Sequence, residues 1–215
     1  RCAHGTDVMA SVWMHNGYLM AEGEKMSKSL GNFYTVHDLL QEFPGEAIRL
    51  ALLKTHYRQP LDFTKDGIRE AKAELDGFYG VLRGVSITDS DDAPTALIDA
   101  LCDDLNTPLS ISQLHNLAAA ANKADGADKP AAALALKSAG TVLGLLQQDP
   151  EAWFKWQPPA RSGGLADAEI DALIAERVAA RQTKDFARAD EIRGILTAEG
   201  IAVEDSAEGA TWRRI

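Results

Sequence analysis

The residues most able to do chemistry lie near the N-terminus in a short polar segment, EKMSKSLGN, and are Lys25, Met26, Ser27, Lys28 and Ser29. Two lysines separated by two residues, with serine hydroxyls beside them, can lie along a triphosphate. Cations placed there stabilise the negative charge that develops as pyrophosphate leaves. An isolated K-x-x-K pattern would more often be a flexible basic turn, but the whole pentapeptide followed by Leu-Gly-Asn favours the functional interpretation.

The elements on either side of this segment must position it. Residues 11–20, SVWMHNGYLM, are rich in β-branched, aromatic and apolar side chains and predict extended structure that turns at Asn16-Gly17. From Thr35 onwards the apolar residues recur with helical spacing, and Thr35 with Asp38 is typical of a helix N-cap with an acidic residue at N3. The lysine-serine segment is therefore expected to be a loop between extended chain and a helix.

The remainder of the chain predicts mainly helices. We expect them over residues 35–44, 46–56, 64–83, 95–105, 107–123, 130–147, 167–182 and 186–198, followed by a short hairpin of residues 201–204 and 211–214. Thr107 and Pro108 are expected as the N-cap and first residue of one helix. The helices between residues 95 and 147 predict an antiparallel bundle with Cys102 in its core, and QPPARSGG at residues 157–164 predicts a linker.

Charge and composition narrow the function classes. The net charge of −10 argues against a non-specific nucleic-acid binder, because phosphate neutralisation needs clustered Lys and Arg. Residues 1–60 carry a net charge of 0, residues 61–160 carry −7 and residues 161–215 carry −3, so the two ends are the parts more able to meet RNA. No apolar run reaches about 18 residues, so we expect no membrane-spanning helix. Two distant cysteines favour a reducing, cytoplasmic location.

The whole chain resembles the cysteinyl-tRNA synthetases, a family of class I aminoacyl-tRNA synthetases. KMSKS is the second signature of class I, and the segments that carry the closer resemblance occur in the family's order: RCAHG, VWMHNGYLM, EKMSKSLGNF, HYRQPLDF, DDLNTP, VLGLL and EGATWRR. The resemblance implies a mainly α chain: a remnant of a class I Rossmann-type catalytic domain, with a strand and the KMSKS loop, then a helical bundle and a small α+β C-terminal module. The domains expected from it are the end of the catalytic domain (1–34), a stem-contact helical region (35–84), a tRNA-binding helical bundle (85–157), a linker (158–164) and an anticodon-binding module (165–215).

The same resemblance implies ATP-dependent ligation of L-cysteine to tRNA(Cys) through a cysteinyl-adenylate. In the family's pattern Lys28 contacts ATP and Lys25 supports the transition state of adenylate formation, so these two lysines are the expected catalytic residues. Met26, Ser27 and Ser29 complete the expected ATP-binding loop, and Mg²⁺ accompanies ATP. The expected partners are tRNA(Cys), ATP and L-cysteine, and the expected state is a monomer.

The departures from the family pattern also have consequences. The class I His-Ile-Gly-His-type signature is absent, since none of the five histidines lies in such a motif: His4, His15, His37, His56 and His115. The segments that supply the family's zinc ligands are absent too, so Zn²⁺ is expected in the full-length enzyme with no metal ligand in this chain. Cys2 and His4 are possible ligands by type, but a lone pair favours a structural interpretation. We therefore expect a C-terminal fragment that is inactive alone.

The last module carries candidate RNA contacts. Unpaired bases are recognised by aromatic or Arg planes and by hydrogen bonds to base edges, and in the resembling family this module reads the anticodon. The expected tRNA-binding residues are Arg188, Asp205, Trp212, Arg213 and Arg214. The alternative is a small helical cap whose arginines make surface ion pairs and whose tryptophan fills the core.

Two other functions are compatible with parts of the sequence. A related cysteine ligase that acts on an amino-sugar would share KMSKS, but it has no use for the Pro-Pro linker and the terminal TWRR module. A non-catalytic tRNA-binding module would have no use for a triphosphate clamp.

Overall fold

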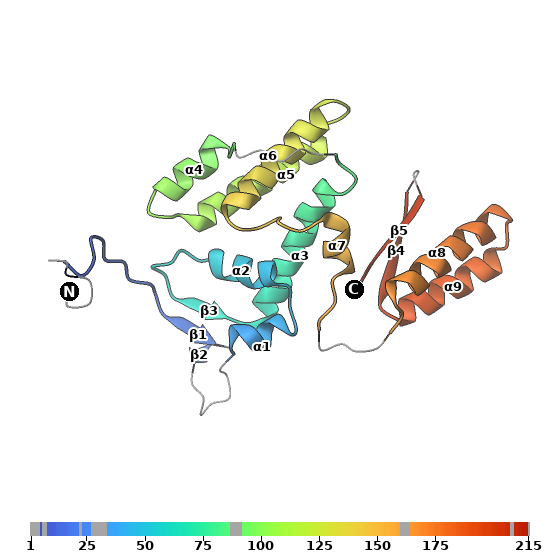
Figure 1. The fold of residues 1–215 in the computed structure, drawn as a ribbon, viewed down its shortest axis with the longest axis horizontal. Helices are drawn as coiled ribbons and strands as arrows, with labels where there is room; N and C mark the ends of the chain where they lie inside the picture. The colour runs from blue at the N-terminus through green and yellow to red at the C-terminus, as the bar shows by residue number, and fades with distance from the viewer. Residues whose placement is uncertain are drawn as a thin grey trace.

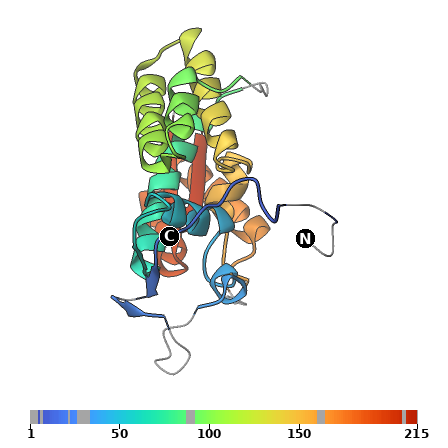
Figure 2. The same cartoon turned by 90° about the vertical axis from the view of Figure 1, so that its left-hand side faces the viewer.

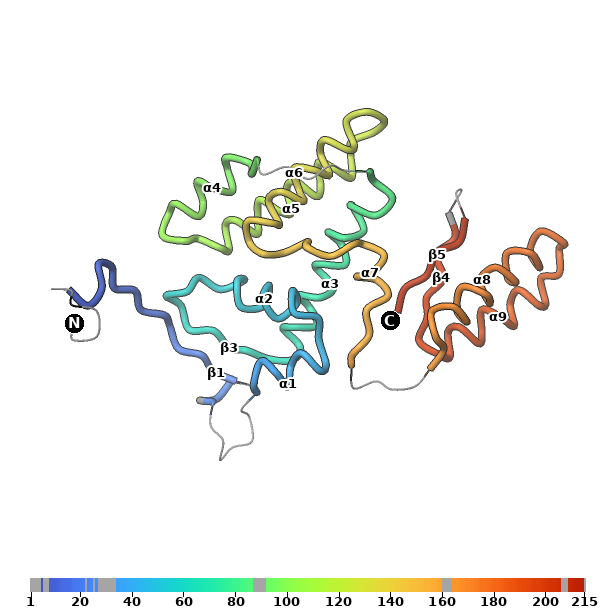
Figure 3. The backbone as a smooth tube through the Cα atoms, in the orientation of Figure 1, coloured from blue at the N-terminus to red at the C-terminus, as the bar shows by residue number. Residues whose placement is uncertain are grey.

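The chain folds into three regions that follow one another along the sequence (Figure 1). The computed structural model describes residues 5, 8–21, 23–26, 34–86, 92–159, 164–206 and 209–214. A small sheet with three helices comes first, a helical bundle second and a module of two helices and two strands last. The mainly helical fold class predicted from the sequence is confirmed. In Figure 3 the last module lies beside the bundle region, with helix α7 (Pro150–Lys155) between strand β5 (Gly209–Arg214) and helix α3 (Lys65–Leu82).

The first region contains a three-stranded sheet in the order β2-β1-β3, formed by β1 (Leu19–Ala21), β2 (Glu24–Lys25) and β3 (Leu61–Phe63). Strand β1 pairs antiparallel with β2 and parallel with β3, so that Met20 lies opposite both Lys25 and Asp62. The β1–β2 hairpin turns at Gly23, whose φ of +78° is the left-handed conformation that glycine adopts without strain. Its N–H donates to the Asp62 carboxylate at 2.9 Å, which ties the turn to β3.

The turn predicted at Asn16-Gly17 is wrong. Gly17 instead lies against the loop before β3, and its N–H donates to the Tyr57 carbonyl oxygen at 2.6 Å. A Cβ atom at Gly17 would come within 2.2 Å of the Gln59 carbonyl oxygen, so glycine is needed here for close backbone approach. In the sequence, an Asn-Gly pair that forms a turn cannot be told from one whose glycine allows close backbone approach.

This region also contains the helices α1 (Val36–Leu40), α2 (Gly45–Leu53) and α3, of which α2 packs against α3 and contacts β3. The predicted capping box is present, because the Thr35 hydroxyl accepts from the Asp38 N–H and the Asp38 carboxylate accepts from the Thr35 N–H. Thr64 caps α3 by accepting from the Gly67 N–H at 2.9 Å. Helix α2 ends at Leu53, three residues before the predicted end.

The second region consists of α4 (Thr95–Cys102), α5 (Thr107–Lys123) and α6 (Asp128–Val142). Helices α5 and α6 pack against α3, and α4 packs against α5. The cap of α5 is Asn106, whose side chain accepts from the Leu109 N–H at 3.1 Å, and not Thr107 as predicted. Helix α6 stops at Val142 because Gly144 turns left-handed at a φ of +67° and the Leu145 N–H returns to the Gly140 carbonyl oxygen. Cys102 is exposed, so the expectation that it packs in the core is wrong. Helix α7 was not predicted.

The buried carboxylate of Glu46 connects the first two regions. It accepts the Tyr79 hydroxyl of α3 at 2.9 Å, the Leu146 N–H at 2.8 Å and the Gln147 N–H at 3.0 Å. Burial raises the pKa of Tyr79, which keeps that hydroxyl protonated as a donor. The Tyr79 ring stacks on Trp153 of α7 with centroids 4.5 Å apart, so this network sits where α2, α3, α7 and the turn after α6 meet.

The third region has its own core. Helices α8 (Asp167–Gln182) and α9 (Phe186–Ala198) have the predicted bounds and pack on a hairpin of β4 (Ile201–Ser206) and β5, in which Val203 lies opposite Trp212. An ion pair also joins the helices to the hairpin, because Arg177 of α8, buried to 8% exposure, donates to Asp205 at 2.7 and 2.9 Å. No helix in the described part of the chain is long and apolar enough to cross a bilayer.

Replacing Glu46 with alanine should lower the free energy of unfolding by about 3 kcal/mol, because each buried donor left without an acceptor costs on the order of 1–3 kcal/mol. Urea denaturation followed by far-UV circular dichroism measures this loss. The matched control, Glu46→Gln, keeps the volume and one acceptor oxygen and should lose less. Equal stability of Glu46→Ala and the unmodified chain would contradict the role given to this carboxylate.

Replacing Asp205 with asparagine should lower the melting temperature at pH 7, and the difference from the unmodified chain should shrink below about pH 4. Hydrogen bonds from Arg177 lower the pKa of Asp205 to about 2. Since the folded pKa lies below the unfolded one, the stabilisation is present above the unfolded pKa and is lost as pH falls toward 2. Thermal melts over this range check it, with Glu199→Gln at the end of α9 as control. A difference that stays constant with pH would refute the assignment.

Candidate functional site

The KMSKS segment begins on the β1–β2 hairpin. The Lys25 backbone belongs to β2, and Met26 directly after it is partly buried. Ser27, Lys28 and Ser29 lie outside the described residues. The hairpin lies at the end of the molecule opposite the α4–α6 bundle, as the two views show (Figure 2). The segment therefore starts from a strand held by β1 and, through Asp62, by β3.

The loop after α2 connects this sheet to the bundle. The Asp104 carboxylate, in the turn between α4 and α5, accepts the Tyr57 hydroxyl at 2.6 Å and the Arg58 guanidinium at 2.7 and 3.0 Å. The Asp104 carbonyl oxygen lies 3.0 Å from His56 Nε2. Hydrogen bonds from Arg58 and Tyr57 lower the pKa of Asp104 to about 2, so this carboxylate stays ionised at neutral pH.

The Asp104 cluster also supports the N-terminal segment, because the Tyr57 carbonyl oxygen is the acceptor for Gly17. Tyr57 and Arg58 lie in HYRQPLDF and Asp104 lies in DDLNTP, two of the segments that carry the family resemblance. The Asp104 backbone has a φ of +52°, which is unusual for a residue with a side chain. DDLNTP carries no local pattern that identifies its partner, since that partner lies 46 residues earlier in the chain.

The candidate RNA contacts of the C-terminal module are mostly engaged within the module. Arg188 donates to Glu176 at 2.8 Å and to Glu191 at 2.7 Å, and these two bonds raise its pKa. Arg213 lies 3.0 Å from Glu204 as an ion pair, and Arg214 donates to Asp167 at 2.6 Å. A phosphate or base that binds these arginines would therefore have to displace the carboxylates or share the arginine N–H groups with them.

Trp212 and Asp205 contribute to the module's packing. Trp212 is 3% exposed, and its indole N–H donates to Asp171 at 2.6 Å. Its ring face does not lie open to a base, a geometry that favours the core-packing alternative for this residue. Asp205 is held by Arg177 and, at 2.6 Å, by Arg181.

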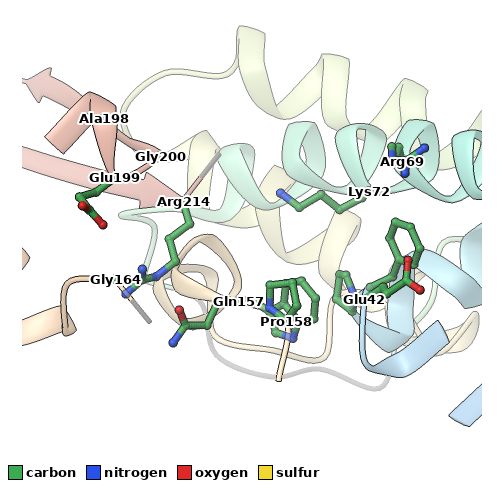
Figure 4. Close-up of a pocket in the computed structure, with 13 residues that line it drawn as sticks. Glu42, Arg69, Lys72, Gln157, Pro158, Gly164, Ala198, Glu199, Gly200 and Arg214 are labelled. Atoms are coloured by element: carbon green, nitrogen blue, oxygen red, sulfur yellow. The ribbon is translucent and has the colours of Figure 1, made fainter. Parts of the chain in front are cut away.

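A cavity of about 560 Å³ lies between α3, the residues after α7 and the C-terminal module (Figure 4). Figure 4 shows Arg214 and Glu199 from the module on one side, with Lys72, Arg69 and Glu42 on the other. Each of the three cations forms an ion pair with a carboxylate: Arg69 with Asp66, Lys72 with Asp76 and Arg214 with Asp167. With both signs of charge on its walls, the cavity has no clear preference for one class of ligand.

Metal ligands were expected outside this chain. Across the described ranges, no group of three or more His, Cys, Asp and Glu side chains is arranged to hold a metal ion. Cys2 and His4 lie outside those ranges.

Comparison with protein families identifies three segments. A model of the class I (C) tRNA synthetase catalytic domain matches residues 1–73, a DALR domain model matches residues 96–147, and a model of the cysteinyl-tRNA ligase anticodon-binding domain matches residues 164–213. The first match contains the β1–β2 hairpin and the KMSKS segment, and the third contains the whole α8–β5 module apart from its last residues.

Among known proteins, the chain is similar to cysteine–tRNA ligases. It is 58% identical to that of Rhodospirillum centenum over 214 residues, covering 100% of this chain and 47% of that protein. The identity is 56% to the enzyme of Paramagnetospirillum magneticum and 48% to that of Caulobacter vibrioides, in each case over 99% of this chain and 47% of the relative. The chain thus spans about half the length of the curated relatives it matches. With these three domain matches and with relatives that align over 99–100% of its length, the chain belongs to the cysteinyl-tRNA synthetase family of class I aminoacyl-tRNA synthetases.

Proposed function

We propose that this chain supplies the KMSKS loop and the tRNA-binding region for ATP-dependent ligation of L-cysteine to tRNA(Cys). The observation that carries the proposal is the presence, on one chain, of KMSKS within the catalytic-domain match and of the anticodon-binding match. The cysteine carboxylate attacks the α-phosphorus of ATP, pyrophosphate leaves, and the acyl group then passes from the adenylate to the 3′-terminal adenosine of the tRNA.

In the first step the loop acts on the phosphates. Lys28 contacts ATP and Lys25 stabilises the negative charge that accumulates as pyrophosphate separates, while Met26, Ser27 and Ser29 complete the loop. Such cations are effective because they are held in place before charge develops. The β1–β2 hairpin supports this role, since its turn is bonded to Asp62. Mg²⁺ enters bound to ATP. The described residues contain no fitting metal site, so no step of this chain is assigned to zinc.

In the second step the C-terminal module meets the anticodon. Arg188, Arg213 and Arg214 exchange their carboxylate partners for RNA, and Asp205 and Trp212 hold the hairpin that carries the last two. The division of the chain at residues 34, 84, 157 and 164 follows from this assignment of roles. The monomeric state and the cytoplasmic location remain predictions.

Replacing Lys28 with alanine in a protein that spans the full length of the relatives should slow cysteine-dependent ATP–pyrophosphate exchange by about 10²–10³-fold, the usual effect of removing one preorganised charge-stabilising group. Lys54→Ala is the matched control, because it also removes one lysine charge from the same region and Lys54 forms its ion pair with Glu74 on α3. An undiminished exchange rate for Lys28→Ala would overturn the proposed role of KMSKS.

The 215-residue chain alone should bind tRNA(Cys) more tightly than a non-cognate tRNA and should show no cysteine-dependent exchange. Gel-shift competition measures the preference, and the exchange assay measures activation. Equal affinity for both tRNAs would favour the amino-sugar ligase, which needs no anticodon. Exchange activity in the isolated chain would contradict the expectation that it needs a further part of the active site.

A further inference from the structure

Arg83, directly after α3, lies between the bundle region and the C-terminal module. Its Nε and Nη2 donate to the Glu151 carboxylate of α7 at 2.5 and 2.8 Å, and its Nη1 donates to Glu204 of β4 at 3.0 Å. Nη2 also lies 3.4 Å from the Trp212 carbonyl oxygen of β5. The side chain is 14% exposed, and its guanidinium lies 4.8 Å from the centroid of the Phe154 ring. One side chain therefore contacts α7 and both strands of the module.

Hydrophobic burial does not merge the two regions. The described residues form two core clusters that share no member: Phe154 belongs to the larger cluster and Trp212 to the smaller one. Polar contacts cross between them. Besides those of Arg83, Lys155 Nζ lies 4.0 Å from Asp171 and 4.7 Å from the centroid of the Trp212 ring. The angle between the regions is therefore sensitive to a few charged side chains.

The geometry of Arg83 suits it to set that angle. A planar guanidinium that binds one carboxylate through two N–H groups and a second carboxylate through a third group fixes direction as well as distance. A lysine at this position would supply the positive charge but not the two N–H groups, fixed in one plane, that bind the same carboxylate. The only covalent connection between the regions passes through QPPARSGG, whose composition predicts a linker that does not itself dictate an angle.

We propose that Arg83 is a positioning residue for tRNA recognition, which holds the C-terminal module at the angle where it and the helical bundle contact one tRNA together. This inference rests on the proposed function. Two contacts on the same RNA reinforce each other only when their spacing matches the RNA, and a module already oriented avoids the cost of ordering on binding. Arg83 itself touches no RNA in this arrangement.

The test compares Arg83→Met with Arg69→Met in the 215-residue chain. Both variants remove one positive charge near α3, but Arg69 pairs with Asp66 of the same helix and does not reach the module. The dissociation constant for tRNA(Cys) should rise about tenfold in Arg83→Met, as expected when two linked contacts lose their matched geometry. It should change by less than about twofold in Arg69→Met, because the ion pair that this variant removes lies within one helix. Small-angle X-ray scattering should show a larger radius of gyration for Arg83→Met alone.

Glu204→Gln gives the sharper outcome, because two explanations predict opposite signs. Removing a carboxylate next to Arg213 should tighten RNA binding if only local charge matters. If the bridge to Arg83 sets the angle, Glu204→Gln should weaken binding, and adding Arg83→Met should weaken it little further. Arg83→Lys should resemble Arg83→Met. Tighter binding by Glu204→Gln would overturn the positioning role, as would unchanged affinity in both single variants.

The two proposals fail in distinguishable ways. If the unmodified chain does not bind tRNA(Cys), the proposed function fails. If it binds and neither Arg83→Met nor Glu204→Gln binds more weakly, only the role of Arg83 fails. Should Arg83→Met lose the far-UV circular dichroism of the module, Glu204→Gln still decides the question, because Arg83 keeps its Glu151 partner in that variant.

Discussion

The larger core of this chain runs from Leu39 to Phe154, and a second core of six buried residues lies between Ile170 and Trp212. Each core holds its own helices together, but neither extends into the other. Burial of apolar surface is non-directional, whereas a forked ion pair is directional. Where α7 meets β5, the hydrogen bonds and ion pairs that cross between the two regions come from Arg83 and Lys155.

Two carboxylates, the buried one of Glu46 and the exposed one of Asp104, connect the helices to the loop that leads toward the KMSKS segment. Glu46 joins α2 to α3 and to the turn after α6, and Asp104 holds the loop after α2. That loop in turn receives Gly17 and leads into β3, the strand that pairs with β1. The hairpin that begins the KMSKS segment is thus connected, through a series of short contacts, to the helical bundle that the proposed function assigns to tRNA.

Several charged side chains of the C-terminal module form ion pairs within that module. The arginines proposed to meet RNA form ion pairs with Glu176, Glu191, Glu204 and Asp167 in the free chain. RNA binding then replaces one anionic partner of each arginine with another. The free energy of binding gained per arginine is therefore smaller than for an arginine that has no carboxylate partner. Together with the net charge of −10, this disfavours non-specific RNA binding and leaves shape and geometry to provide the selectivity.

The sequence alone determined the features that depend on local chemistry. KMSKS, the Thr35–Asp38 capping box, the helices at residues 167–182 and 186–198 and the terminal hairpin each depend on residues close together in the chain. The family matches confirm the resemblance that KMSKS and the segments quoted with it indicated. The predicted ends of α2 and α6 were too late, because each helix stops where the turn after it packs, before the helical spacing of apolar residues ends.

The tertiary structure alone decided the contacts between distant segments. Asn16-Gly17 has the local signature of a turn, yet Gly17 is needed for close approach to Gln59. Trp212 and its neighbouring arginines have the composition of an RNA-stacking strand, yet the ring is buried and the charges are paired. No local sequence pattern marks Arg83, because its partners Glu151 and Glu204 lie 68 and 121 residues away in the chain. The type of a side chain determines which groups it can bind, but only the folded structure brings one particular partner within contact distance.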